Sequence, residues 1–206
     1  CLRNYDYIFA PSIGEYKYLS RRLDSSKFMF LKGGGLDINQ NKFENKYDLR
    51  EKLDLPKKSK IIIWVGRYNK LQGLHLVLDI YKRLKKDIKD VELIIIGKRD
   101  KEEPLYEEVM KSGAITTGHI KNEMVIKYLN ASDVSICPID LKDRRLNWMV
   151  PFGDIGVWQL ESASVNTPNI SPLLIHFSGT ADERRKIGVT VKDTIDCYNA
   201  TKLILS

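Results

Sequence analysis

The sequence predicts an α/β protein in which a parallel sheet carries helices on both faces. Apolar runs and helical patterns alternate from about residue 59 to the C-terminus, which is typical of repeated strand–helix units. The runs Ile61–Val65 and Val91–Ile96 are short and continuous, as expected of strands that are covered on both faces. Three predicted strands end at a glycine (Gly66, Gly97 and Gly118), where the chain can turn and a ligand can approach the backbone.

Composition fits a soluble globular protein with an anionic partner. The 206 residues are 43% hydrophobic and 30% charged, which excludes a disordered chain. The net charge of +7 suits nucleotide phosphates, an acidic membrane surface or nucleic acid, and charge alone does not choose among them. No apolar run approaches a membrane span, and the first residues do not form a signal peptide. Because the sequence opens without Met, we expect a fragment of a longer protein.

The cysteines predict a reducing compartment. Cys1, Cys137 and Cys197 are widely spaced, without a Cys-x-x-Cys pair and without histidines at metal-ligand spacing. We therefore expect unpaired thiols and a cytoplasmic location, with Cys137 as a small core residue.

The first 58 residues are predicted to lie outside the main domain. Residues 5–10 and 28–31 are predicted to form short strands, with a helix between them from Ser12 to about Leu23. The triple glycine at 33–35 is either a hinge or ligand-facing turn, or a plain flexible loop. Residues 39–58 are polar and read as a linker with a short helix at 48–53.

The main domain, residues 59–206, continues with alternating elements. The helix expected at 74–88 has one apolar face and one basic face; the basic face is either merely solvated or contacts an acidic membrane surface. Further strands are expected at 115–119, 133–138, 169–171 and 189–191. Further helices are expected at 104–111 and from 153 to about 165. Two more helices are expected to begin after cap residues, one after Asn122 and one after Asp193.

An anion site is predicted where these elements meet. Arg67 follows the first strand of the domain, at the sheet edge where open α/β sheets bind ligands, and its guanidinium matches phosphate oxygens; the alternative is an ordinary surface arginine. The free amides of Ile155, Gly156 and Val157 open a helix and favour an anion. Glu161, two turns into that helix, can accept from the paired hydroxyls of a ribose, or is a solvated helix residue. Taken together in their order along the chain, Arg67, the amides of residues 155–157 and Glu161 indicate a bound nucleoside diphosphate.

Competing signatures are absent from the sequence. There is no Gly-x-x-x-x-Gly-Lys-Ser/Thr phosphate loop, no Gly-x-Gly-x-x-Gly turn, no Asp-x-Asp pair, no His-Glu-x-x-His and no Gly-x-Ser-x-Gly elbow. Basic and aromatic residues are not interleaved, which disfavours nucleic acid as the partner. His75 is expected to be structural, whereas His119, just after Gly118, is a candidate for ligand contact.

These motifs together resemble the retaining GT-B glycosyltransferases of the glycosyl transferase group 1 type. Val65-Gly66-Arg67 with Gly73 is similar to that family's strand-Gly-Arg and Lys-Gly loop. The following blocks of the family also occur in order, at residues 117–119, 128–134 and 138, and then at 156–161, 163 and 168. Residues 1–38 resemble the end of the family's N-terminal domain with its interdomain linker, and Gly35-Leu36-Asp37 matches the linker's Gly-Val-Asp.

The resemblance implies a Rossmann-like C-terminal domain that binds a UDP- or GDP-sugar without metal or other cofactor. It implies sugar transfer to a glycan or lipid-linked acceptor, a catalytic group in an N-terminal domain, and a location in the cytoplasm or at the cytosolic membrane face. Arg67 would hold the diphosphate, the amides of residues 155–157 would cradle phosphate and sugar, and Glu161 would take the ribose hydroxyls. The candidate donor-binding residues are Gly66, Arg67, Lys70, Gly118, His119, Asp154, Ile155, Gly156, Val157 and Glu161.

Two positions depart from the family pattern. The lysine expected directly before the loop glycine is Gln72, and Lys70, Arg144 or Arg145 would have to substitute for it. The first Glu of the family's Glu-x7-Glu pair falls on Gly153, with Asp154 one step out of register. These departures support an alternative reading, in which the chain is a degenerate GT-B domain that acts as a non-catalytic partner or scaffold.

Overall fold

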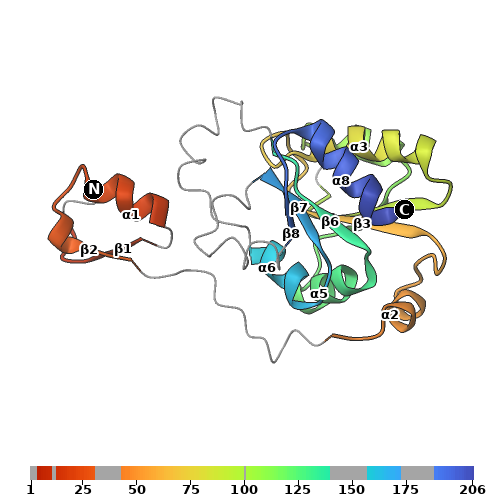
Figure 1. The fold of residues 1–206 in the computed structure, drawn as a ribbon, viewed down its shortest axis with the longest axis horizontal. Helices are drawn as coiled ribbons and strands as arrows, with labels where there is room; N and C mark the ends of the chain where they lie inside the picture. The colour runs from red at the N-terminus through yellow and green to blue at the C-terminus, as the bar shows by residue number, and fades with distance from the viewer. Residues whose placement is uncertain (1–3, 11–12, 31–42, 100, 140–156, 173–187) are drawn as a thin grey trace.

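The computed structural model describes residues 4–10, 13–30, 43–99, 101–139, 157–172 and 188–206, arranged as a small N-terminal unit and a larger α/β domain (Figure 1). The small unit is one strand–helix–strand repeat: β1 (Ile8–Ala10), α1 (Ile13–Ser20) and β2 (Phe28–Phe30). The two strands are parallel, with Ile8 opposite Phe28, and α1 packs against β2. A 3-10 turn, η2 (Ser25–Lys27), precedes β2, and the carboxylate of Asp24 accepts the amide of Ser26 at 3.0 Å.

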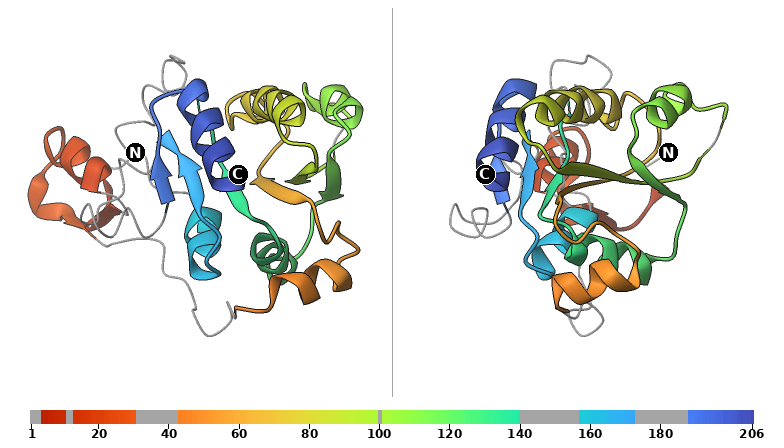
Figure 2. Two further views of the ribbon diagram at one scale, coloured as in Figure 1. Left: turned by 45° about the vertical axis from the view of Figure 1, so that its right-hand side comes forward. Right: turned by 90° about the vertical axis from the view of Figure 1, so that its right-hand side faces the viewer.

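The larger domain is built on a sheet of six parallel strands in the order β5-β4-β3-β6-β7-β8 (Figure 2). The central strand β3 pairs with β4 over its whole length, from Lys60 opposite Val91 to Val65 opposite Ile96. The strands are β3 (Lys60–Val65), β4 (Val91–Ile96), β5 (Ile115–Gly118), β6 (Val134–Ile136), β7 (Asn169–Ser171) and β8 (Gly188–Thr190).

Helices cover both faces of this sheet (Figure 2). Along β3, Ile62 and Trp64 enter the core on one face, and Ile61 and Ile63 enter the core on the other, as the two-residue period of a strand requires. The first face is covered by α3 (Leu74–Asp87), α4 (Tyr106–Lys111) and α8 (Thr194–Leu205). The second is covered by α2 (Lys46–Lys52), α5 (Asn122–Ala131) and α6 (Val157–Ser164).

Helix α2, in the segment predicted as a linker, is fixed to the domain by a buried arginine. The Arg50 guanidinium donates to the carbonyl of Ala131 at 2.9 Å and to the carboxylate of Asp133 at 2.7 Å. Asp133 also accepts the amide of Ile61 at 2.7 Å and forms an ion pair with Lys46 at 2.9 Å. Burial by itself would raise the pKa of Asp133, but the Ile61 amide and the two cations outweigh burial and hold the pKa below its ordinary value.

The predicted fold class is confirmed, and the elements agree closely with the predicted ranges. Asp193 caps α8 as expected, accepting the amides of Ile195 and Asp196. Asn122 was expected to cap α5, but this prediction is wrong: Lys121 occupies the cap position and Asn122 is the first helical residue.

Cys137 is buried in the core, as predicted, and burial raises the pKa of its thiol to about 12. The predicted cap Ser12 lies outside the described residues. None of the described helices has the length and apolar character needed to cross a membrane.

Candidate functional site

A hollow of about 590 Å³ lies where the carboxyl ends of β3, β4 and β5 meet. Open parallel sheets bind their ligands at this edge, because the loops that leave the strands there can surround a small molecule. The hollow is lined by Val65, Gly66, Arg67, Gln72, Ile96, Gly97, Lys98, His119, Ile120, Lys121, Asn122 and Val125.

The glycines allow the three strand ends to lie against one another. The amide of Gly66 donates to the carbonyl of Ile96 at 2.9 Å, and the amide of Gly97 donates to the carbonyl of Gly118 at 3.1 Å. A Cβ atom at Gly97 would lie only 1.9 Å from the carbonyl oxygen of Gly66, so no side chain fits at this position. Gly118 has a φ of +76°, which favours glycine. The strand ends therefore need glycine to pack this closely, and Gly66 and Gly97 add no side chain to the lining of the hollow.

Gln72 closes the loop that follows β3. Its side-chain oxygen accepts the backbone amide of Arg67, and the backbone amide of Gln72 donates to the side-chain oxygen of Asn69 at 3.0 Å. The indole nitrogen of Trp64 donates to the carbonyl of Gln72 at 3.3 Å. Gly73 then occupies the cap position before α3 with a φ of +76°, and a Cβ there would lie 1.7 Å from the carbonyl oxygen of Pro138. The position expected to carry a diphosphate lysine thus holds an uncharged residue that is bonded to the loop.

The lining of the hollow is cationic. Arg67, Lys98 and Lys121 are exposed and come from three different strand ends or loops, and His119 is exposed beside them. No residue among those that line the hollow is acidic. Cationic side chains that converge on a concave surface can bind phosphate oxygens by charge and by hydrogen bonds.

Glu161 lies next to the hollow, in α6. The residue is only 5% exposed, and its Oε1 atom accepts from the side-chain amide of Asn122 at 3.0 Å. Because Asn122 lines the hollow, the carboxylate is connected to the hollow by one hydrogen bond. A carboxylate in this position can accept from hydroxyl groups of a ligand.

The predicted site residues are distributed as follows. Gly66, Arg67 and His119 line the hollow, and Gly118 ends β5 beside it. Lys70 is exposed in the loop after β3 and is not among the lining residues. Val157 is the first residue of α6. Asp154, Ile155 and Gly156 lie outside the described residues, as do Gly153, Arg144 and Arg145.

Sequence reasoning did not select several residues that line the hollow, namely Gln72, Gly97, Lys98, Ile120, Lys121, Asn122 and Val125. Two of them carried a usable signal. Gly97 and Lys98 follow β4 in the way that Gly66 and Arg67 follow β3, so the same strand-end argument selects them. Gln72, Ile120 and Lys121 reach the site through loop conformations, and Asn122 and Val125 reach it from the first turns of α5.

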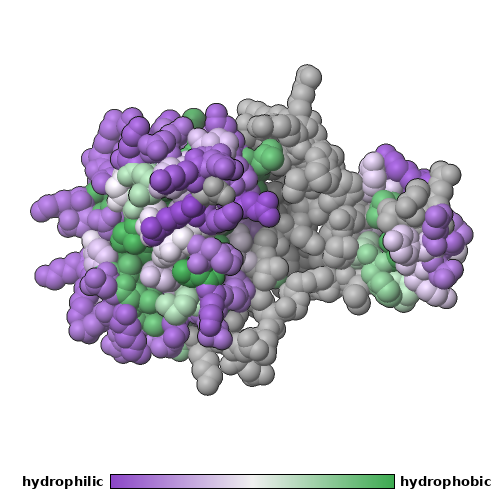
Figure 3. All heavy atoms as spheres, turned by 180° about the vertical axis from the view of Figure 1, so that it is seen from behind, coloured by the Kyte–Doolittle hydropathy of each residue, from purple (hydrophilic) through white to green (hydrophobic). Residues whose placement is uncertain are grey.

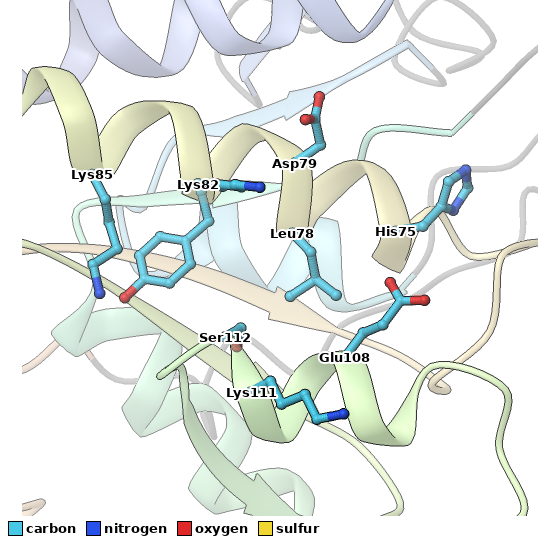
Figure 4. Close-up of a pocket in the computed structure, with 9 residues that line it drawn as sticks. His75, Leu78, Asp79, Lys82, Lys85, Glu108, Lys111 and Ser112 are labelled. Atoms are coloured by element: carbon cyan, nitrogen blue, oxygen red, sulfur yellow. The ribbon is translucent and has the colours of Figure 1, made fainter.

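A second hollow, of about 580 Å³, lies between α3 and α4 (Figure 4). Its wall has the side chains of Lys82, Lys85 and Lys111, together with His75 and Glu108 (Figure 4). It lies over a helical face of the sheet and not at the ends of strands, and two acidic residues, Asp79 and Glu108, stand among its lysines. We therefore place the candidate site at the carboxyl edge of the sheet.

Known structures share this fold. Sucrose-phosphate synthase from Thermosynechococcus elongatus superposes with a TM-score of 0.74 and 21% identity, over 99% of this chain and 50% of that protein. WaaG, a glycosyltransferase involved in lipopolysaccharide biosynthesis, gives 0.71 and 15%, over 96% and 53%. HepE from Anabaena, in complex with UDP and glucose, gives 0.68 and 14%, over 96% and 53%. The chain spans about half the length of these structures, and at these identities the likeness shows the fold alone.

The family is shown by the sequence itself. None of the curated proteins gives a significant match to the chain. The family model described as "Glycosyl transferases group 1" matches residues 45–171, which run from the residue that caps α2 to the last residue of β7. The chain therefore belongs to the glycosyl transferases group 1 family.

Proposed function

We propose that this chain is the donor-binding half of a retaining, metal-independent glycosyltransferase. The donor is a UDP- or GDP-sugar, the acceptor is a glycan or a lipid-linked molecule, and the protein works in the cytoplasm or at the cytosolic face of a membrane. Family membership supports transfer from a nucleotide sugar, and the structures of HepE with UDP and glucose provide an example in a protein of the same fold.

One observation carries the proposal: the hollow at the carboxyl edge of β3, β4 and β5 is lined by three exposed cations, Arg67, Lys98 and Lys121, and by no acidic residue. A nucleoside diphosphate presents negative oxygens that match Arg67, Lys98 and Lys121. In the reaction the diphosphate leaves with increased negative charge, and fixed cations stabilise that charge in the transition state. Arg67 is the member of this set that follows the central strand, so we assign the diphosphate to it.

Glu161 and the small N-terminal unit complete the proposed assignment. The buried carboxylate of Glu161 takes the ribose hydroxyls of the donor. The unit formed by β1, α1 and β2 belongs to a preceding domain that supplies the acceptor site and the catalytic group. On this basis the chain alone binds nucleotide and does not turn over.

Calorimetric titration of the chain with UDP and with GDP tests the proposal. We expect one of the two to bind at micromolar to millimolar concentration, and Arg67→Ala to weaken binding about tenfold or more, because a charge-assisted hydrogen bond is lost. Arg83→Ala is the matched control, since Arg83 is an exposed arginine of α3 that forms an ion pair with Asp79 and does not line the hollow. Absence of heat from both nucleotides at millimolar concentration, or equal binding by Arg67→Ala, contradicts the proposal.

Gln72 favours a second candidate function, that of a non-catalytic GT-B domain kept as a partner or scaffold. Its side chain is bonded to the backbone of its own loop, at the position where the family resemblance expects a lysine. Under the second candidate, protein that includes the preceding domain shows no sugar transfer or donor hydrolysis even with Gln72→Lys and Gly153→Glu combined. Transfer by the unmodified protein excludes it.

A further inference from the structure

The side chain of Asn122 has a role in the structure that its position in α5 does not explain. Asparagine near a helix start usually caps the helix by accepting backbone amides with its side-chain oxygen. Here Lys121 is at the cap position, and the side-chain nitrogen of Asn122 instead donates to Oε1 of Glu161, 39 residues further along the chain. The bond joins the first turn of α5 to α6 at the rim of the hollow.

Glu161 is a carboxylate on the apolar side of its helix. Trp158 and Val165, which lie three residues before and four residues after it, belong to the core between the sheet, α5 and α6, so all three residues share one face. A carboxylate buried on such a face costs free energy unless it accepts hydrogen bonds. In the part of the chain that the structure describes, Asn122 is the donor to Oε1, and no side chain or amide donates to Oε2.

We propose that Asn122 is a positioning residue for nucleotide recognition: its amide holds Oε1 of Glu161 and thereby leaves Oε2 to accept from a ribose hydroxyl. The inference rests on the proposed function, in which Glu161 takes the ribose. A neutral amide is suited to this task, because it fixes the carboxylate while leaving its charge available to the ligand. A cation in its place would compete with the hydroxyls for that charge.

The test compares a nucleotide with its 2′-deoxy form. Whichever of UDP or GDP binds the 206-residue chain more tightly is titrated by calorimetry together with its 2′-deoxy analogue. The ratio of the two dissociation constants measures recognition of the ribose. A variant that is partly unfolded loses binding sites without changing this ratio, so the readout separates recognition from folding. We expect the wild-type chain to prefer the ribonucleotide about tenfold or more.

Asn122→Asp is the decisive variant because it keeps the shape of the side chain, removes the donor and places a second carboxylate beside Glu161. We expect the preference to fall to the level of Glu161→Gln, within about threefold of unity, and Asn122→Ala to reduce it in the same direction. Asn199→Asp is the matched control: Asn199 is exposed on α8, which covers the other face of the sheet, and the wild-type preference should be retained.

The outcomes separate the two proposals. If Asn122→Asp and Asn122→Ala keep the full preference while Glu161→Gln loses it, the role of Asn122 is overturned and the proposed function stands. If Glu161→Gln also keeps the preference, the carboxylate does not bind the ribose hydroxyls. The assignment of Glu161 to the ribose is then wrong, and the inference about Asn122 fails with it. If the wild-type chain binds neither nucleotide, the proposed function itself is contradicted.

Discussion

The small N-terminal unit and the large domain use the same strand–helix–strand arrangement, but in the described residues only the sheet of the large domain is covered by helices on both faces. In β3, Ile62 and Ile63 are 0% exposed, because helices cover both faces of the sheet. In the small unit, Tyr7 is 66% exposed, Phe9 57% and Met29 51%, and apolar residues are visible at its surface (Figure 3).

This difference indicates which parts of the molecule are stable on their own. Parallel sheets are normally buried on both faces, and a two-stranded sheet with one helix buries too little apolar surface to be stable by itself. The large domain has two continuous apolar cores, one on each face of its sheet. The candidate site lies wholly within the large domain. We therefore expect that changes to the large domain alter stability and binding, and that changes to the small unit alter neither in this chain.

The largest expected effect compares two tyrosines. Tyr81 is 1% exposed and its hydroxyl donates to Glu92, whereas Tyr7 is 66% exposed. Tyr81→Ala should reduce the free energy of unfolding by about 3–5 kcal/mol, because it leaves a large cavity in the core. Tyr7→Ala should change it by less than about 0.5 kcal/mol. Urea unfolding followed by circular dichroism measures both, and similar losses for the two variants would show that the small unit folds together with the domain.

The next effect concerns two arginines. Arg50→Ala removes the buried guanidinium that joins α2 to Ala131 and Asp133, and it should cost about 2–4 kcal/mol in unfolding free energy. Arg83→Ala breaks an exposed ion pair with Asp79 and should cost less than about 1 kcal/mol. The same urea titrations report both values. An Arg50 variant as stable as the Arg83 variant would mean that α2 is not part of the folded domain.

The smallest effect is the dependence of stability on pH that Asp133 contributes. Its pKa is lowered in the folded domain, since the Ile61 amide and the cations outweigh the opposing effect of burial. The carboxylate therefore contributes stability that is fully present above its unfolded pKa of about 3.9 and is lost as pH falls through the lower folded value. Asp133→Asn should be less stable at pH 7 and should lose less stability on acidification. An unchanged slope of unfolding free energy against pH below pH 4 would contradict this account.

Much of the fold was predictable because the strands are apolar runs with clear ends. The range of β4 matches the predicted 91–96, since Asp90 and Gly97 bound the apolar run, and the range of β7 matches the predicted 169–171, since Pro168 and Pro172 flank it. The hydrogen bonds from Arg50 to Ala131 and Asp133 were not predictable, because in the sequence Arg50 is one charged residue among several in a polar segment. Only the fold brings it to Asp133, 83 residues away.

The candidate site divides in the same way. Gly66, Arg67 and His119 could be selected because each follows a strand, and parallel strands end at a common edge. Gln72 and Lys121 reach the hollow through loop conformations that have no period in the sequence. Asn122 was predicted to be a cap from its residue type, and the structure corrects this because its side chain finds a buried carboxylate across the α5–α6 contact instead.

The central claim is that the carboxyl edge of the large sheet binds a nucleoside diphosphate. The most direct measurement is an NMR titration of the labelled chain with UDP and with GDP, following each backbone amide. We predict shifts at Gly66, Gly97, Gly118 and Asn122, and none in β1, α1 or β2. Absence of shifts at these glycines at millimolar nucleotide, or shifts confined to the hollow between α3 and α4, would contradict the claim.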